Sequence, residues 1–189
     1  MVGIQPEYDI TMVMNGCLGG LVGITANCSV VAPWDAVMIG LASGLVYVKS
    51  FKLLVMLKID DAVGAIPVHF FCGIWGCIAT GLFASPVHTG LAYGNDEKVG
   101  LLNGSGSLIA VELAGIAFII AWTAGIMTPF FLILNALGMF RVDPLEEEVG
   151  LDISHHKGAA YDLTTADKSA VDELVEKRAT AHGEKFDEA

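Results

Sequence analysis

Long stretches without charged residues constrain the fold of this chain more than any other feature. Asp, Glu, Lys and Arg are absent from residues 11–34 and 62–95, and residues 99–140 contain a single one, Glu112. The hydrocarbon core of a bilayer is about 30 Å thick, and a helix needs roughly 20 apolar residues to cross it. Because these stretches are long enough to span, the sequence predicts an all-α membrane protein.

We predict four membrane-spanning helices, over residues 11–31, 36–57, 63–83 and 108–139. The turn between the first two contains Pro33 and Asp35, which suit the start of a helix, and Trp34, which suits the membrane interface. Residues 85–107 are rich in Gly, Asn and Ser and predict a long external loop. Pro129 lies inside the last predicted span and favours a bend or tilt there.

The distribution of Lys and Arg predicts the orientation. Lys49, Lys52 and Lys58 lie in the last part of the second predicted span or directly after it, and six Lys or Arg residues follow residue 140, whereas the opposite side has only Lys98. Cytoplasmic segments carry the excess of Lys and Arg, so both ends of the chain are predicted to be cytoplasmic. The domain prediction is a transmembrane region over residues 1–140 and an acidic cytoplasmic tail over residues 141–189.

The remaining composition narrows the classes of function. The net charge of −11 comes mainly from the tail, which argues against binding nucleic acid or anionic lipid. All four cysteines lie in apolar stretches without a CxxC pair, so we expect packing positions and neither a metal site nor a cofactor. Residues 1–10 contain Glu7 and Asp9 and no basic segment, so no signal peptide is predicted.

Glycines four residues apart predict close helix packing. The pairs are Gly16 with Gly20, Gly19 with Gly23, and Gly40 with Gly44. Small residues at this spacing let helices approach closely in lipid. We expect ordinary packing of a helix bundle and not a glycine-lined pathway.

His69 is an ionisable residue near the middle of the third predicted span. Such a group is costly in lipid, so it should face protein or a cavity. Its neighbours offer no charged partner, which favours a neutral imidazole able both to donate and to accept a hydrogen bond. From the residues alone, a hydrogen-bonded core histidine is favoured over a transport-pathway residue. A metal or haem ligand together with Cys72, on the same helical face, is a third alternative.

Two further features surround this histidine. Pro67 has no N–H, so we expect the carbonyl of Val63 to be left unpaired within the span. No nucleophile, base or acidic partner accompanies His69 in the sequence. The chain is therefore not predicted to be an enzyme.

Three motifs resemble one known family. The run DDAVGAIPVHFFCGIWG at residues 60–76 resembles a signature of the Amt ammonium transporters, in wording nearest to algal, diatom-like members. The run MNGCLGGLVGITA at residues 14–26 is similar to a helix of that family. EVGLD at residues 148–152, followed by His156 and Tyr161, resembles its cytoplasmic segment.

The resemblance implies transport of ammonium or ammonia through a hydrophobic pore in a multi-pass protein of the plasma membrane. Members form homotrimers of eleven-helix protomers, and the four predicted helices correspond to the last four. His69 falls on the second of two pore histidines, and Ala65 falls on a pore-facing position one turn earlier. A regulatory segment that contacts a neighbouring protomer corresponds to Gly150, Asp152, His156 and Tyr161.

The chain also departs from the family. The first pore histidine, the external aromatic site and the phenylalanine gate belong to helices that this sequence lacks. Phe70 stands where the family often has Gly. We therefore expect an incomplete, C-terminal portion of a transporter. The alternative is a truncated, non-conducting membrane subunit that modulates full-length protomers, and an upstream reading frame that encodes the other helices would favour the first interpretation.

Overall fold

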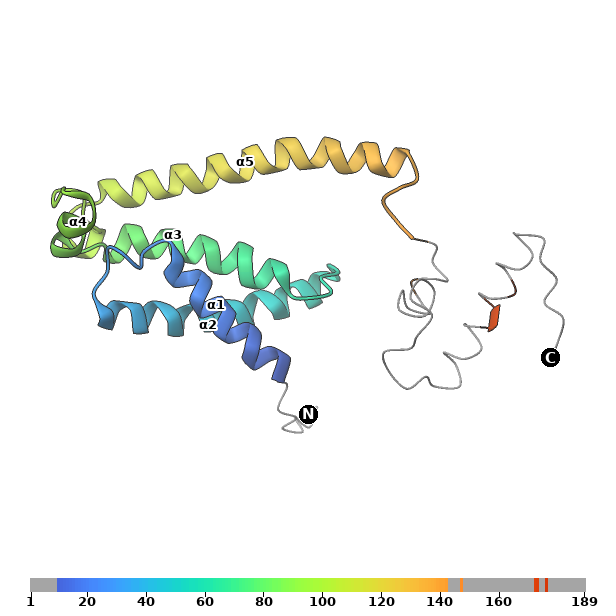
Figure 1. Cartoon of the computed structure of the whole chain (residues 1–189), viewed down its shortest axis with the longest axis horizontal. Helices are drawn as coiled ribbons and strands as arrows, with labels where there is room; N and C mark the ends of the chain where they lie inside the picture. The colour runs from blue at the N-terminus through green and yellow to red at the C-terminus, as the bar shows by residue number, and fades with distance from the viewer. Residues whose placement is uncertain (1–9, 143–146, 148–171, 174–175, 177–189) are drawn as a thin grey trace. The chain divides into compact units, whose positions relative to one another are not determined.

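A computed structural model describes residues 10–142, 147, 172–173 and 176 (Figure 1). In these residues all regular structure is helical and no strand occurs. The chain divides into two compact units, Met1–Thr123 and Ala124–Ala189, and helix α5 (Ser107–Ala136) contributes to both. The predicted regulatory residues lie outside the described part of the chain, so their role stays a prediction: Gly150, Asp152, His156 and Tyr161.

Three helices of the first unit lie side by side (Figure 1). They are α1 (Ile10–Thr25), α2 (Pro33–Leu57), and the π-helix η1 (Ile66–Phe71) that continues into α3 (Cys72–Phe83). Among the described residues, three helical segments are long and apolar enough to cross a bilayer: Pro33–Leu57, Ile66–Phe83 and Ser107–Ala136. The prediction of an all-α chain with apolar spanning helices is confirmed.

Helix α1 is shorter than predicted. It has 16 residues and ends at Thr25, because residues 26–30 form turns instead of continuing to residue 31. At 1.5 Å per residue its length is about 24 Å, less than the thickness of a hydrocarbon core. The first predicted span is thus present as a short apolar helix.

In the turn before α2, Pro33 and Asp35 have the roles at a helix start that were predicted for them. Pro33 occupies the first turn of the helix, where the lack of an N–H costs nothing. The Asp35 carboxylate accepts a hydrogen bond from the Ala32 N–H at 3.3 Å, which pairs one of the groups that a helix start leaves free. Helix α2 therefore begins at Pro33 and not at the predicted residue 36.

Small residues set the contact between α1 and α3. A Cβ atom at Gly76 would lie 2.8 Å from the Gly23 carbonyl oxygen, so the two backbones touch at this crossing. Gly19 and Gly23 are buried, which confirms the packing role predicted for this pair. In contrast, a Cβ at Gly16 or Gly44 would meet nothing within 4 Å in the described part of the chain.

Hydrogen bonds from side chains to backbone carbonyls join the same helices. Asn27, which is fully buried, donates from Nδ2 to the carbonyls of Gly23 at 2.9 Å and Gly76 at 3.1 Å. The Trp75 indole N–H donates to the Ile39 carbonyl at 3.1 Å. In lipid, such bonds and close packing hold helices together, because apolar surface alone gives no preference for protein over acyl chains.

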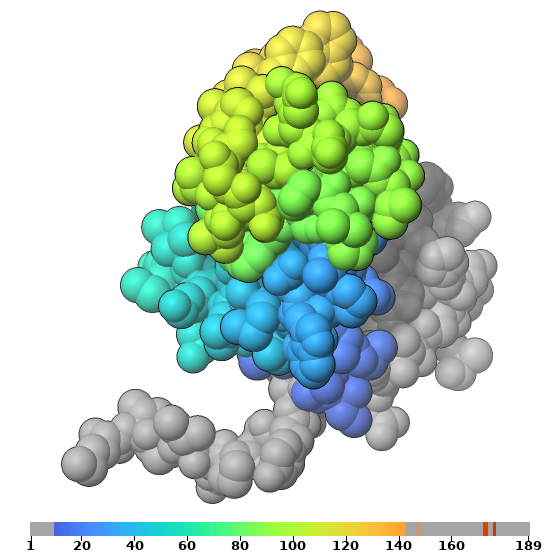
Figure 2. Space-filling view, turned by 90° about the vertical axis from the view of Figure 1, so that its left-hand side faces the viewer, coloured from blue at the N-terminus to red at the C-terminus, as the bar shows by residue number. Residues whose placement is uncertain are grey.

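The connection between α3 and α5 is more ordered than predicted. The expected loop over residues 85–107 contains helix α4 (Pro86–Tyr93) and the 3-10 helix η2 (Leu101–Asn103). The Ser85 hydroxyl accepts the His88 N–H at the start of α4, and Gly94, with φ 66°, ends it. Figure 2 looks onto this end of the bundle, where the Ser85 N–H donates to the Val30 carbonyl at 2.8 Å. The predicted loop is therefore partly helical.

Helix α5 continues through Pro129 and has no buried residue. In the second unit, the Phe131 ring contacts Phe130 at 5.4 Å and Phe140 at 5.2 Å between ring centroids. Arg141 forms an ion pair with Glu147 at 2.9 Å. The exposed, almost wholly apolar surface of α5 is what a helix in contact with lipid or with other apolar helices requires.

Replacing Gly76 by Ala is expected to force α1 and α3 apart, because the new Cβ would lie 2.8 Å from the Gly23 carbonyl oxygen. We expect Gly76→Ala to lower the free energy of unfolding of the complete protein by about 1–3 kcal/mol. Gly44→Ala is the matched control, and it should be neutral or stabilising, since Ala favours a helix over Gly. Thermal unfolding in detergent measures both, and equal midpoints for the two variants would contradict the packing described here.

Candidate functional site

Asp61 fixes the start of the helix that carries His69. Its carboxylate accepts hydrogen bonds from the backbone N–H groups of Ala65 at 2.9 Å and Ile66 at 2.7 Å. Gly64 makes the preceding turn with a φ of 69°. A helix start leaves its first N–H groups unpaired, and an acidic side chain placed there satisfies them. This role of Asp61 was missed in the sequence, although a capping residue followed by a proline-containing segment is a recognisable signal.

The position of Pro67 corrects an expectation. The π-helix η1 begins at Ile66, so Pro67 lies in its first turn and Val63 lies before it. A proline in the first turn interrupts no hydrogen bond between helical residues. The carbonyl of Val63, predicted to be unpaired within the span, therefore lies before the span. The irregularity is instead a wide π turn, in which the Cys72 N–H contacts the carbonyl of Pro67. Single π turns are frequent at functional sites.

The later start of the helix also changes the position of His69 within the apolar segment. The apolar span runs over Ile66–Phe83, so His69 lies three residues after the first residue of the span and closer to its N-terminal end than predicted. The imidazole therefore belongs to the π turn and not to the regular helix that follows.

The π turn separates two faces of this segment. Val68 and Cys72 are buried, at 3% and 0% exposure, and pack in one cluster with Tyr47. The Cys72 thiol also donates to the Ser43 carbonyl at 3.5 Å. His69 and Phe70, which follow Val68, are exposed in this chain. Anchoring of one face in the bundle thus directs the other face, with the imidazole, away from it.

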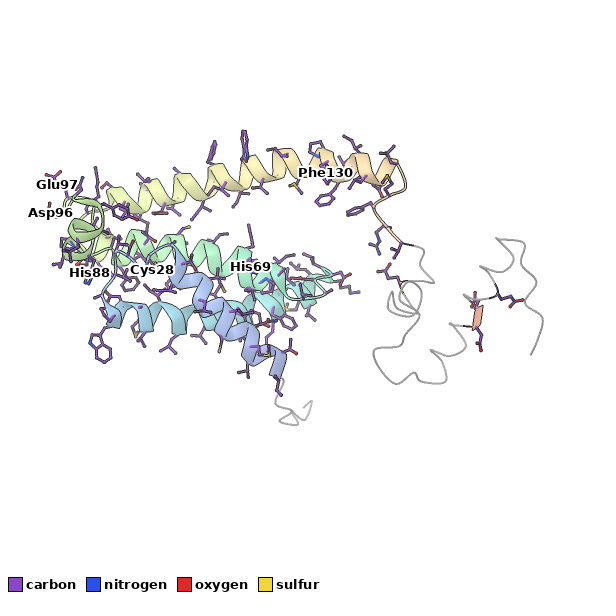
Figure 3. All side chains as sticks on the ribbon, in the orientation of Figure 1. Cys28, His69, His88, Asp96, Glu97 and Phe130 are labelled. Atoms are coloured by element: carbon purple, nitrogen blue, oxygen red, sulfur yellow. The ribbon has the colours of Figure 1, made fainter. Side chains whose placement is uncertain are left out.

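His69 lines an apolar cavity of about 230 Å³ between η1, α3 and the first half of α5; Figure 3 marks its position. The lining residues are His69, Phe70, Gly73, Ile74, Cys77, Ile116, Ile119 and Ile120. The imidazole and one thiol are the only polar side-chain groups among them. The cavity therefore presents a single hydrogen-bonding ring among hydrocarbon walls.

The alternatives left open for His69 can now be compared. Within the described part of the chain no hydrogen bond to its imidazole is found, which does not support a hydrogen-bonded core histidine. Cys72 is buried and His69 is exposed, so the two do not share a face as a ligand pair. No group of three or more potential metal ligands occurs among the described residues.

Two further residues discussed in the sequence analysis, Ala65 and Phe70, lie close to His69 along the chain. Ala65 is exposed, its N–H is held by Asp61, and it does not line the cavity around His69; its pore role stays a prediction. Phe70 lines the cavity and contacts Phe71 edge to face, with ring centroids 5.2 Å apart. The large side chain at position 70 therefore forms part of the wall beside the imidazole.

The sequence is similar to those of known transporters. The sequence model of the Ammonium Transporter Family matches residues 4–161. A putative ammonium transporter 1 member 5 of Arabidopsis thaliana is 39% identical over 161 residues, covering 84% of this chain and 32% of the relative. The ammonium transporter Amt2 of Archaeoglobus fulgidus is 40% identical over 153 residues, covering 81% of this chain and 33% of the relative.

Solved structures give the same result. A sensor Amt protein superposes with a TM-score of 0.67 at 30% identity, over 80% of this chain and 36% of that one. Mep2 of Candida albicans superposes with a TM-score of 0.62 at 26% identity, over 71% of this chain and 29% of that one. The chain spans about a third of the length of the curated relatives that it matches. On this combined sequence and structural similarity, the chain belongs to the ammonium transporter family.

Proposed function

We propose that the protein containing this chain conducts ammonium or ammonia across the membrane, and that His69 lines the pathway. The observation that carries the proposal is the imidazole of His69 exposed to an apolar cavity while its neighbours Val68 and Cys72 are anchored in the bundle. The names of the related transporters supply the substrate.

The chemistry of this cavity suits the proposed substrate. A neutral imidazole has one nitrogen that donates and one that accepts, so it can bind ammonium as an acceptor and ammonia as a donor. Hydrocarbon walls, such as those of Ile116 and Ile120, offer nothing to replace the hydration shell of a metal cation. Potassium would lose its water without compensation, whereas ammonia needs little hydration. The protein proposed here is a channel-like transporter and not an enzyme.

The wider setting belongs to the same proposal. Lys49, Lys52 and Lys58 near the end of α2 favour a cytoplasmic position for that end, and with four spans both ends of the chain are then cytoplasmic. Residues 1–140 form the membrane region and residues 141–189 the tail. Ala65 lies on the pathway one turn before His69. The complete protein assembles as a homotrimer in the plasma membrane.

We expect His69→Ala in the complete protein to reduce ammonium flux or change its selectivity over potassium, because the only imidazole of the cavity is removed. His88→Ala is the matched control, since His88 lies on α4 and bonds to Ser85 outside this cavity. Uptake of methylammonium into proteoliposomes measures both variants. Unchanged flux and selectivity in His69→Ala would remove this residue from the pathway.

Asp61 is proposed as the residue that positions His69. Its two hydrogen bonds hold the start of η1, and His69 is the fourth residue of that helix. If the cap is lost, the start of the helix frays and the imidazole loses its fixed place. Asp60, directly beside it, is exposed and serves as an internal comparison.

Asp61→Ala should destabilise the complete protein by about 0.5–2 kcal/mol, the range for loss of a helix-capping side chain, and should reduce flux. Asp60→Ala removes the same charge without a described hydrogen bond and should change neither quantity. Thermal unfolding and methylammonium uptake are measured on the same preparations. Equal effects of the two variants would show that charge, and not capping, is what Asp61 contributes.

Removal of the chain after Phe140 should alter regulation of transport and leave membrane insertion intact. The apolar span of α5 ends at Ala136, so insertion does not require the tail. Membrane fractionation and uptake measured at low and high external ammonium test the two parts. A truncated protein that fails to insert would show that the tail is structural.

A further inference from the structure

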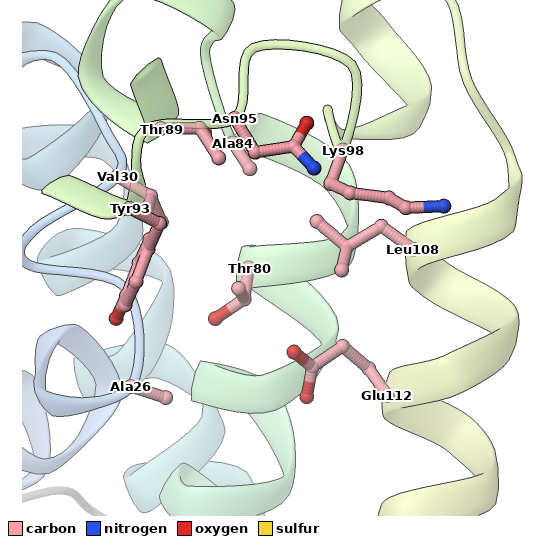
Figure 4. A pocket seen from close by; sticks show the side chains of 10 residues that line it. All are labelled: Ala26, Val30, Thr80, Ala84, Thr89, Tyr93, Asn95, Lys98, Leu108 and Glu112. Atoms are coloured by element: carbon pink, nitrogen blue, oxygen red, sulfur yellow. The ribbon is translucent and has the colours of Figure 1, made fainter. Parts of the chain in front are cut away.

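A second cavity, of about 470 Å³, lies at the α4 end of the first unit (Figure 4). Its lining comes from the turn after α1, the end of α3, α4 and the segment after it, and the first turns of α5. Two of the lining residues carry a charge, Lys98 and Glu112. The cavity therefore brings one cation from a connecting segment and one anion from a membrane helix to the same space.

Lys98 lies directly before an anchored point of the segment between α4 and η2. Val99 is 8% exposed, and the Gly100 N–H donates to the Ala84 carbonyl at 2.8 Å. A Cβ atom at Gly100 would overlap with the carbonyl group of Leu82, so the backbone passes in direct contact with the end of α3. The backbone next to Lys98 is thus held at the rim of the cavity, while the lysine side chain is exposed.

Glu112 has no hydrogen bond or ion pair among the described residues. It is the sixth residue of α5, a helix without any other charged residue, and it is partly buried. Figure 4 shows its carboxylate pointing into the cavity toward Thr80. The Thr80 hydroxyl donates its single proton to the Gly76 carbonyl at 3.1 Å, so it has none left for Glu112. A carboxylate on a membrane helix is costly without a partner, and this one requires a donor.

Lys98 is the cation that the described part of the first unit offers to Glu112. The other lysines of this unit lie near the last turns of α2 or directly after it, at the end away from α4 (Figure 1): Lys49, Lys52 and Lys58. Lys98 also has two acidic neighbours, Asp96 and Glu97, but both are exposed. Ion pairs between exposed side chains contribute little, so the partly buried carboxylate of Glu112 is the partner that gains most from Lys98.

We propose that Lys98 and Glu112 form an ion pair across the cavity and act as a latch between this segment and α5. Figure 4 shows the ammonium group of Lys98 directed away from the carboxylate, so the latch is open in this structure and closes by rotation of the lysine side chain. The flexible four-carbon stem of a lysine allows this movement. Closure seals the cavity and fixes the first turns of α5, a helix that has no buried residue. The latch does not depend on the proposed transport activity.

The direct test is zero-length cross-linking of the unmodified, complete protein with a membrane-permeable carbodiimide. The reagent activates a carboxylate, and a lysine amine in contact with it displaces the activating group as a urea and forms an amide bond. We expect mass spectrometry to find peptides joined through Lys98 and Glu112. Glu112 without a link to Lys98, whether or not Lys98 is joined to Asp96 or Glu97, would contradict the latch.

A double-mutant cycle measures the same contact without a reagent. We expect Lys98→Gln and Glu112→Gln to be coupled by at least about twofold in the unfolding equilibrium of the complete protein, the lower end for residues in contact. Glu97→Gln combined with Glu112→Gln is the matched control, since Glu97 does not line the cavity, and these two changes should be additive. Additive effects of Lys98→Gln and Glu112→Gln would overturn the proposal.

A cysteine in place of Leu108, which lines the cavity, reports whether the latch closes it. We expect Leu108→Cys to react with a neutral thiol reagent at least about twofold faster when it is combined with Lys98→Gln, in line with the coupling expected for the pair. This variant keeps Glu112, so it covers the case in which Glu112→Gln does not fold. Flux is not part of the measurement, so a protein that fails to transport still tests the latch. Equal rates with and without Lys98→Gln would show that the pair does not close the cavity.

Discussion

The Asp61 carboxylate, bound to the N–H groups of Ala65 and Ile66, decides where the helix that carries His69 begins. A helix start leaves its first backbone N–H groups unpaired, and this cap pairs two of them at the point where the chain becomes helical. The π turn that follows places Val68 and Cys72 on the bundle side and His69 on the opposite side. The orientation of the imidazole is a consequence of these two backbone features.

The bundle holds that segment through close backbone contacts at glycines, through the amide of Asn27 and through the ring of Tyr47. Gly23 and Gly76 bring the backbones of α1 and α3 together, and Asn27 bridges their carbonyls. Fully buried Tyr47 packs on Val68 and Cys72 from α2. Helix α5 contributes no buried residue, yet its Ile116 and Ile120 close one side of the cavity of His69. The segment that packs in the bundle through Val68 and Cys72 is thus the same one that exposes His69 to the cavity.

Much of the fold could be read from the sequence, because charge-free stretches report lipid exposure directly. The predicted ends of helices were wrong where hydrogen bonds of single side chains, and not hydropathy, determine where a helix begins or ends. The uncharged residues 26–31 were predicted to be helical, but residues 26–30 form turns around the buried amide of Asn27. Helix α4 was missed, although Ser85 before Pro86 and Gly94 after Tyr93 are a start and stop signal. The side of the helix on which His69 lies depends on a π turn, which hydrophobic periodicity cannot indicate.

The central claim is that the side chain at position 69 faces an accessible cavity while its neighbour at position 68 faces the packed bundle. Single-site modification of His69→Cys and Val68→Cys variants of the complete protein, with a small neutral thiol reagent and mass spectrometry of the labelled peptide, measures this directly. The account predicts rapid modification at position 69 and protection at position 68. Equal modification at both positions, or protection at position 69, would contradict it.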